Sequence, residues 1–189
     1  VRREQPGAAL EFLQTPLAQE WVRQGRLIET QFLGEEDGAL TLEHPRVFFP
    51  SYPWEWTPGA WKAAAELTLD LCDALLERGL ILKDATPLNV LFRGTQPVFV
   101  DVLSVDARDP ESPLWLAYGQ FVRTFLLPLL AYKQLGWPLA ATIQKRDGYE
   151  PADLAPYLSR WQRWREPFRA LVTLPLMLEK SGSQSAQSA

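Results

Sequence analysis

The chain has 189 residues, of which 47% are hydrophobic and 12% aromatic, enough to bury one core in a single globular domain. Its 19 Lys and Arg residues face 23 Asp and Glu residues. The net charge of −4 gives no long-range attraction for nucleic acid or an anionic membrane, so neither is expected as a partner. The single cysteine, Cys72, excludes an internal disulfide and favours a cytoplasmic location. Neither a membrane-spanning apolar run nor a signal peptide is recognisable.

The first part of the chain predicts a broken helix followed by two strands. Apolar residues recur at helical spacing over residues 8–24, with an interruption at Pro16. Residues 26–33 and 38–42 are predicted to form two short strands, because apolar runs flank an acidic, glycine-bounded turn.

A segment rich in proline and aromatic residues, 44–56, separates this part from the rest. Its three prolines exclude a helix, so we expect an extended, partly buried connector. The best-defined helix follows the connector. Thr57 is suited to the N-cap, Pro58 to the first helical position and Gly79 to the residue just beyond the last turn.

The remaining sequence predicts a small hairpin and then mostly helix. Short apolar runs at residues 90–92 and 98–103 indicate two strands joined by a turn. Helices are expected over residues 113–135 and 151–179, the second bent at its prolines. Residues 181–189 have nothing to bury and predict a flexible tail.

Three polar residues after the long helix carry the clearest chemical signal. Asp84 lies five residues before Asn89, and Asp101 follows twelve residues later at the end of a predicted strand. Phosphoryl transfer needs a carboxylate to orient the acceptor hydroxyl and oxygen ligands to hold magnesium on the nucleotide phosphates. Asp84 is the candidate for the first role, and Asn89 and Asp101 are candidates for the second. Because an acid inside an apolar strand needs a partner or a ligand, a structural partner for Asp101, such as Lys83, is the competing interpretation.

The segment 57–103 resembles the protein-kinase and aminoglycoside-phosphotransferase superfamily, whose catalytic loop has the form His-x-Asp-x-x-x-x-Asn followed by a metal-binding Asp. The resemblance implies that Asp84 is the catalytic base, that Asn89 and Asp101 bind Mg²⁺, and that the connector is the hinge between two lobes. More narrowly, Ser-Tyr-Pro-Trp-Glu-Trp, Leu-Lys-Asp-Ala and Pro-Val-Phe-Val-Asp-Val-Leu-Ser are similar to a bacterial family in which this region is joined to a class I S-adenosylmethionine-dependent methyltransferase domain.

Several departures from the superfamily pattern favour a degenerate module. Leu82 stands where the motif has histidine, and Val102-Leu103 replaces the Phe-Gly of protein kinases. All five lysines lie after the connector, and no glycine-rich phosphate loop is present. The chain also lacks Gly-x-Gly, so methyl transfer is expected to lie outside these residues.

Other residues have two readings that the sequence leaves open. Lys83 is a candidate contact for a phosphate or acceptor, or one half of a loop salt bridge. Tyr52 and Trp54 are candidates for stacking on adenine, or for packing within the connector. In the arginine-rich segment 160–169, Trp161 and Trp164 are expected to pack inward, with RNA or membrane binding as the alternative.

We therefore expect an α+β, protein-kinase-like fold with a reduced N-terminal region and a mostly helical C-terminal lobe. Residues 1–56 are assigned to the first part, 57–180 to the second and 181–189 to the tail. The favoured function is a pseudokinase that binds a ligand or substrate for an attached methyltransferase. The alternative is a phosphotransferase that uses Mg²⁺ and ATP on a small-molecule or protein hydroxyl.

Overall fold

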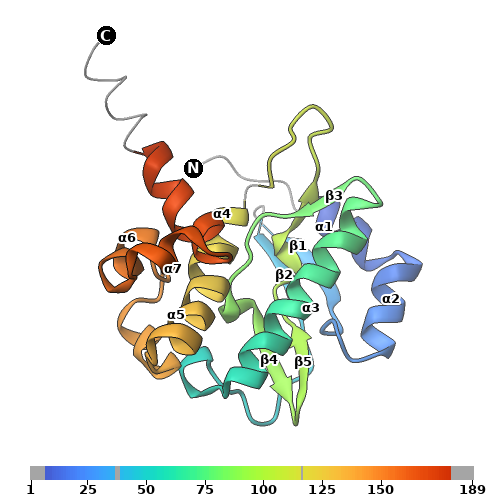
Figure 1. The fold of residues 1–189 in the computed structure, drawn as a ribbon. Helices are drawn as coiled ribbons and strands as arrows, with labels where there is room; N and C mark the ends of the chain where they lie inside the picture. Colours follow the sequence, from blue (N-terminus) through green and yellow to red (C-terminus); the bar gives the residue numbers. More distant parts are fainter. Residues whose placement is uncertain (1–6, 37–38, 116, 180–189) are drawn as a thin grey trace.

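The computed structural model describes residues 7–36, 39–115 and 117–179 (Figure 1). It begins with two short helices, α1 (Gly7–Leu13) and α2 (Pro16–Arg23), which confirm the predicted break. The hydroxyl of Thr15 caps α2 by accepting a hydrogen bond from Ala18 N–H at 3.2 Å. Proline is tolerated at the first position of a helix, where its missing N–H would have no intrahelical partner.

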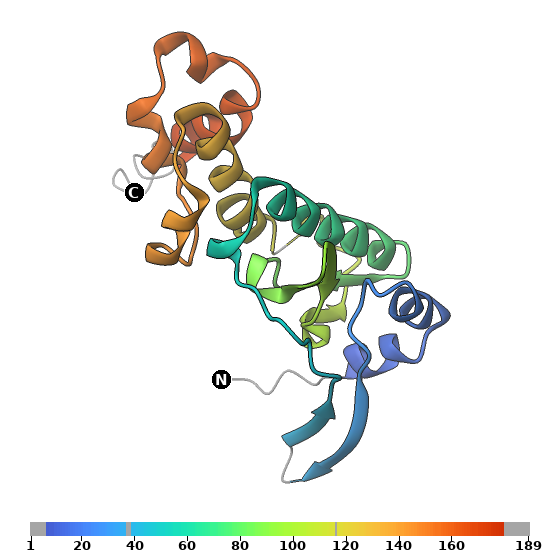
Figure 2. The same ribbon diagram turned by 90° about the horizontal axis from the view of Figure 1, so that it is seen from below.

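The hairpin formed by β1 (Gln31–Glu36) and β2 (Ala39–Glu43) projects from the body of the molecule (Figure 2). The first strand was predicted to begin at residue 26, and that start is wrong. Residues 26–28 pair with the distant Phe99 instead. Ile28 N–H donates to Phe99 O at 2.9 Å, and Phe99 N–H donates to Arg26 O at 2.8 Å. This stretch is buried in the main core, so tertiary pairing overrides the local strand pattern.

The long helix α3 (Pro58–Leu76) confirms the best-defined prediction. The Thr57 hydroxyl accepts a hydrogen bond from Ala60 N–H at 3.2 Å, and Gly79 adopts a positive φ of 69° beyond the helix end. Cys72 lies on the buried face, where desolvation is the main cause that raises the pKa of its thiol. The thiol is therefore protonated at neutral pH and acts as a small apolar group in the core.

Two more antiparallel pairs follow α3: β3 (Leu80–Leu82) pairs with β6 (Val105–Ala107), and β4 (Val90–Arg93) pairs with β5 (Gln96–Phe99). The predicted hairpin is confirmed, but its second strand ends earlier than expected. The chain turns after β5 into a 3₁₀ helix, η3 (Val102–Ser104), with Asp101 at the position preceding it. The expectation that Asp101 lies within a strand is therefore wrong.

The C-terminal half contains one continuous helix made of α4 (Tyr118–Phe121), the π-helical turn η4 (Val122–Leu126) and α5 (Leu127–Leu135). The helix was predicted to begin at Pro113, which is too early. The Trp115 indole N–H donates to Leu82 O at 3.1 Å, so the chain first crosses β3 before it becomes helical. Pro128 lies near the π-helical turn, where an interior proline removes a backbone hydrogen bond.

Short helical pieces complete the described chain and confirm a mostly helical C-terminal region: η5 (Leu139–Gln144), α6 (Pro151–Leu154), η6 (Ala155–Tyr157), α7 (Arg160–Trp164) and the π-helical η7 (Arg169–Thr173). The predicted packing of the two tryptophans of α7 is wrong, because Trp161 is 84% exposed and Trp164 is 60% exposed. Arg163 faces the protein instead, and its guanidinium donates to Ala155 O at 2.7 Å.

Helices and small antiparallel sheets are packed around two hydrophobic clusters, and the protein is a mixed α and β structure. The larger cluster joins α1, α2, α3 and the β4–β5 hairpin, and the smaller one joins α5 to the last helices. In the part of the chain that the structure describes, no helix has both the length and the apolar character needed to span a bilayer. The predicted tail, residues 181–189, lies outside the described residues.

Two glycines with positive φ allow a test of close packing in the C-terminal half. A Cβ on Gly148 (φ 86°) would lie 2.2 Å from the carbonyl oxygen of Arg123, whereas one on Gly136 (φ 70°) would meet no atom within 4 Å. Both alanine variants are strained by the left-handed backbone, at about 1 kcal/mol. We expect Gly148→Ala to lose roughly 2 kcal/mol more, because its backbone contact cannot relax cheaply. Urea unfolding followed by circular dichroism measures both, and equal losses would contradict the close contact.

Candidate functional site

The loop 83–89 is held between two strand pairs. At its start, Lys83 N–H donates to Ser104 O at 2.8 Å, next to the β3–β6 pair. At its end, the 3₁₀ turn η2 (Pro87–Asn89) leads directly into β4, and Val100 N–H donates to Asn89 O at 2.8 Å. The loop is thus fixed at both ends by backbone hydrogen bonds.

The structure brings Asp84, Asn89 and Asp101 into one hydrogen-bonded group. The amide nitrogen Nδ2 of Asn89 lies 3.4 Å from the Asp84 carbonyl oxygen and 3.3 Å from Ser104 Oγ. The Ser104 hydroxyl donates in turn to Asp101 Oδ2. Ser104 therefore connects the two candidate metal ligands, and it is 1% exposed.

Asp84 is exposed, but its carboxylate is oriented by a residue from the following helix. Gln120 Nε2 donates to Asp84 Oδ1 at 3.3 Å, and Gln120 Oε1 accepts from Ala85 N–H at 2.6 Å. The Thr124 hydroxyl, one turn further along the helix, lies 3.3 Å from Ala85 O and 2.8 Å from Gln120 O. The helical half of the molecule therefore positions the carboxylate that was predicted as the catalytic group.

The donor atoms of this group have the chemistry that Mg²⁺ prefers. Carboxylate oxygens of Asp101 and the amide oxygen of Asn89 are hard oxygen ligands. The printed bonds use the Asn89 nitrogen and one oxygen of Asp101, Oδ2, and so leave the Asn89 amide oxygen and Asp101 Oδ1 for a ligand. Among the described residues, no three His, Cys, Asp or Glu side chains converge in a metal-binding cluster. Asn89 and Asp101 are the residues that would hold a magnesium ion here.

Lys83 forms an ion pair with Asp106, whereas the sequence suggested Asp101 as its partner. Its ammonium lies 3.8 Å from Asp106 Oδ2, on the strand paired with β3. The sequence left two roles open for Lys83, a contact to a phosphate or acceptor and a loop salt bridge, and this ion pair favours the salt bridge.

The connector places its aromatic residues in a compact turn, η1 (Pro53–Glu55). The rings of Tyr52 and Trp54 stack with centroids 5.2 Å apart and an interplanar angle of 10°. The guanidinium carbon of Arg146 lies 5.3 Å from the Trp54 ring centroid. Tyr52 is 46% exposed and Trp54 is half-buried, so the connector is packed yet leaves part of this aromatic surface accessible.

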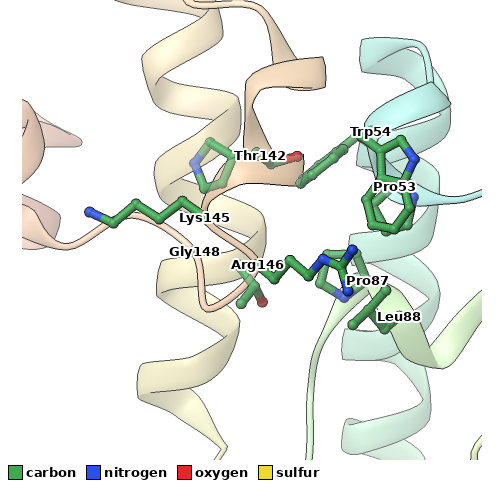
Figure 3. Close-up of a pocket in the computed structure, with 11 residues that line it drawn as sticks. Pro53, Trp54, Pro87, Leu88, Thr142, Lys145, Arg146 and Gly148 are labelled. Carbon is green, nitrogen blue, oxygen red and sulfur yellow. The ribbon is translucent and has the colours of Figure 1, made fainter.

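A pocket joins this connector to the loop that contains Asp84 and Asn89 (Figure 3). Its walls come from the connector (Pro53, Trp54), the loop (Pro87, Leu88), the helices α3 and α5, and the segment 142–148. The cavity volume is about 20 Å³, which is room for about one water molecule. Tyr52, Lys83, Asp84, Asn89 and Asp101 are not among its lining residues.

The segment that closes the pocket is fixed by an ion pair on its outer side. The Lys145 ammonium bonds to the carboxylate of Asp153, and Glu150 N–H donates to the same oxygen at 2.7 Å. Partial burial acts to raise the pKa of Asp153. The hydrogen bonds from Lys145 and Glu150, together with the Lys145 charge, outweigh it and hold that pKa below its usual value. The pair therefore stabilises the folded protein when Asp153 is ionised.

Three residues of this region were missed in the sequence: Ser104, Gln120 and Arg146. Ser104 follows Asp101 by three residues, but serine is common in turns and the spacing carries no specific signal. Gln120 and Arg146 reach the loop and the connector from distant segments, so no local pattern indicates them.

Comparison with known protein families finds no match to this chain. The chain is similar to the nodulation protein NoeA of Rhizobium meliloti, with 37% identity over 139 residues. This match covers 69% of the chain but 29% of NoeA. The chain therefore spans less than a third of the length of that relative.

Replacing Ser104 tests the hydrogen-bonded group. Ser104→Ala removes the bond to Asp101 and leaves the Asn89 amide with one partner fewer. We expect the free energy of unfolding to fall by about 1–2 kcal/mol, the usual loss for buried hydrogen bonds with a charged acceptor. Thr95→Ala is the control, because Thr95 is an exposed hydroxyl in the β4–β5 turn. A Ser104→Ala loss no larger than that of the control, in urea unfolding, would contradict the arrangement.

The ion pair of Asp153 predicts a dependence of stability on pH. Its folded pKa is lowered, so its contribution is present above the ordinary value and is lost as pH falls through the folded value. Asp153→Asn should therefore destabilise the protein more at about pH 6 than at about pH 3, in urea unfolding at each pH. The exposed Asp147→Asn variant is the control and should show a smaller change with pH. A pH-independent effect of Asp153→Asn would refute the assignment.

Proposed function

We propose that the chain is a kinase-like, non-catalytic module that binds a ligand or substrate and works beside an S-adenosylmethionine-dependent methyltransferase domain. The observation that carries the proposal is the geometry of the loop. The Ser104 hydroxyl accepts from the Asn89 amide and donates to Asp101, which gathers a kinase-like set of residues, while the Lys83 ammonium of the same loop is ion-paired with Asp106.

The order of elements supports the kinase-like part of this proposal. A long capped helix, α3, leads through β3 into the loop with Asp84 and Asn89, and the β4–β5 hairpin then delivers Asp101. The pairing of β3 with β6 closes the loop from the other side. Asn89 donates toward the Asp84 carbonyl, which keeps the two residues in a fixed relation. This order of elements supports the kinase-like part of the proposal.

The residue types that bind nucleotide phosphates bear on the proposal that the module is non-catalytic. Residues 1–61 contain no lysine, and the whole sequence contains no Gly-x-Gly. A kinase needs a lysine and a glycine-rich loop to hold the nucleotide phosphates. Lys83 is ion-paired with Asp106 on β6. Within these 189 residues the candidate metal ligands are accompanied by neither a lysine before the connector nor a glycine-rich loop.

The methyltransferase association is supported by the sequence resemblance and by the length of the relative. NoeA is named as a nodulation protein of a bacterium, and most of it lies outside the region similar to this chain. The unmatched part of such a protein has room for a catalytic domain. We therefore place methyl transfer outside these 189 residues and assign this region to ligand or substrate binding.

An active phosphotransferase acting on a small-molecule or protein hydroxyl is the second candidate, and one observation favours it. The Asp84 carboxylate is exposed and is oriented by Gln120, as a group that accepts a hydrogen bond from an acceptor hydroxyl should be. In this candidate Mg²⁺ would be held by the Asn89 amide oxygen and by Asp101 carboxylate lone pairs that the Ser104 hydroxyl does not use.

A thermal-shift titration with Mg-ATP separates the two candidates. A ligand that binds only the folded state raises the melting temperature, so the non-catalytic module predicts no magnesium-dependent rise at about 1 mM ATP. A rise that requires Mg²⁺ and disappears in Asp101→Ala, together with phosphate release, would overturn the proposal in favour of the phosphotransferase. Asp73→Ala is the matched control, because Asp73 is an exposed carboxylate on α3.

A further inference from the structure

We infer that an open groove between the connector and the edge of β4 binds an extended acidic peptide, which adds to the protein as a further strand. The groove lies between residues 46–51 and 92–94, and its volume is about 540 Å³. Asp84, Asn89 and Asp101 are not among its lining residues, so this interaction surface goes beyond the proposed function.

Two consecutive phenylalanines give the groove an apolar surface that the described chain leaves uncovered. Phe48 and Phe49 are each 80% exposed, and their rings meet edge to face with centroids 4.8 Å apart. The preceding residue, Val47, packs against the main core, so the segment that carries the two rings is anchored. Large exposed apolar side chains gathered at a concave surface are typical of a site that binds a partner.

Two arginines give the groove a positive charge. Arg46 and Arg93 are exposed lining residues, and no carboxylate is among the lining residues in the described part of the chain. Within residues 7–36, 39–115 and 117–179, neither arginine forms an ion pair. Guanidinium groups bind carboxylates through paired hydrogen bonds, so charge complementarity predicts an acidic partner.

Unpaired backbone on both sides of the groove favours an extended peptide over a compact ligand. In the described chain, residues 45–50 form no hydrogen bond to another backbone group, and β4 pairs with β5 and with no other strand. Phe92 of β4 lies opposite Pro97, which has no N–H, so the backbone groups of Phe92 face the open edge of the sheet. An open strand edge accepts a further strand through backbone hydrogen bonds.

Both sides of the groove are held in place by contacts to the core. The Trp56 indole N–H donates to Ser51 Oγ at 3.0 Å, which fixes the end of the connector segment. The ring of Phe92 lies 5.0 Å from the ring of Trp56, and both side chains are buried. A groove that is fixed in advance loses less entropy when it binds a peptide.

Fluorescence anisotropy with labelled octapeptides tests this inference. The probe alternates glutamate and valine, so as a strand it presents carboxylates on one face and apolar groups on the other. The comparison peptides alternate lysine with valine and glutamate with serine. We expect the glutamate–valine peptide to bind about tenfold more tightly than either, and its affinity to fall when NaCl is raised to about 0.5 M.

N-methylation of the glutamate–valine peptide tests the strand addition itself. Methyl groups on alternate nitrogens remove the N–H donors along one edge of the peptide strand, and two versions of the peptide block either edge. We expect at least one version to bind about tenfold more weakly than the parent peptide. Unchanged affinity in both versions would overturn the inference.

Substitutions on the groove assign the contacts. Arg46→Gln combined with Arg93→Gln should abolish the preference for glutamate over lysine, whereas the exposed Arg108→Gln is the matched control and should keep it. Phe48→Ala should weaken the glutamate–valine peptide, and the equally accessible control Tyr157→Ala should not. Melting temperatures confirm that each variant is folded.

Four results would each contradict a peptide site. These are no peptide binding, a glutamate preference that survives the double arginine variant, tighter binding of an oligothymidylate of the same length, and a dimer in sedimentation that Phe48→Ala dissociates. The last two would assign the groove to nucleic acid or to a second copy of the chain. Because ATP and Mg²⁺ are absent from these assays, none of the results depends on the Mg-ATP titration.

Discussion

The set of bonds made by Ser104 is the constraint on which the centre of the structure depends. Its carbonyl accepts from Lys83 N–H at the start of the loop, and its hydroxyl links Asn89 at the end of the loop to Asp101 after the hairpin. A single buried serine therefore contacts three chain segments, and it adds to the backbone bond between Val100 and Asn89 and to the pairing of β3 with β6. It also fixes the orientation of the two candidate metal ligands relative to each other.

The elements that the sequence predicts best are those in which local signals agree. The cap at Thr57, the proline at position 58 and the apolar face of α3 indicate one helix, and the structure has it. The runs at 90–92 and 98–99 likewise predict the hairpin. Errors occur where a distant partner overrides the local pattern. Residues 26–28 pair with Phe99, so β1 begins later than predicted. Trp115 donates a hydrogen bond to Leu82 O, so the helix that starts with α4 also begins later than predicted.

The candidate site could be predicted only in part, for a related reason. Asp84, Asn89 and Asp101 follow one another closely enough for a spacing argument. Gln120 and Arg146 come from later helices and turns, so their contribution depends on tertiary packing that no local spacing encodes. The aromatic connector shows the same limit. Its composition predicts burial, yet only the structure reveals that Trp54 borders a pocket shared with the loop.

The projecting β1–β2 hairpin has a consequence for the motions of the protein. Within the described residues, its strands pair with each other and with no third strand, and Phe32 and Leu33 are 50% and 59% exposed. A two-stranded sheet is marginally stable by itself. Its attachment to the body comes largely from Leu42 and Val47, which pack against the main core. The hairpin therefore opens locally at a lower free energy than the body does, and its amide hydrogens exchange with solvent before those of α3.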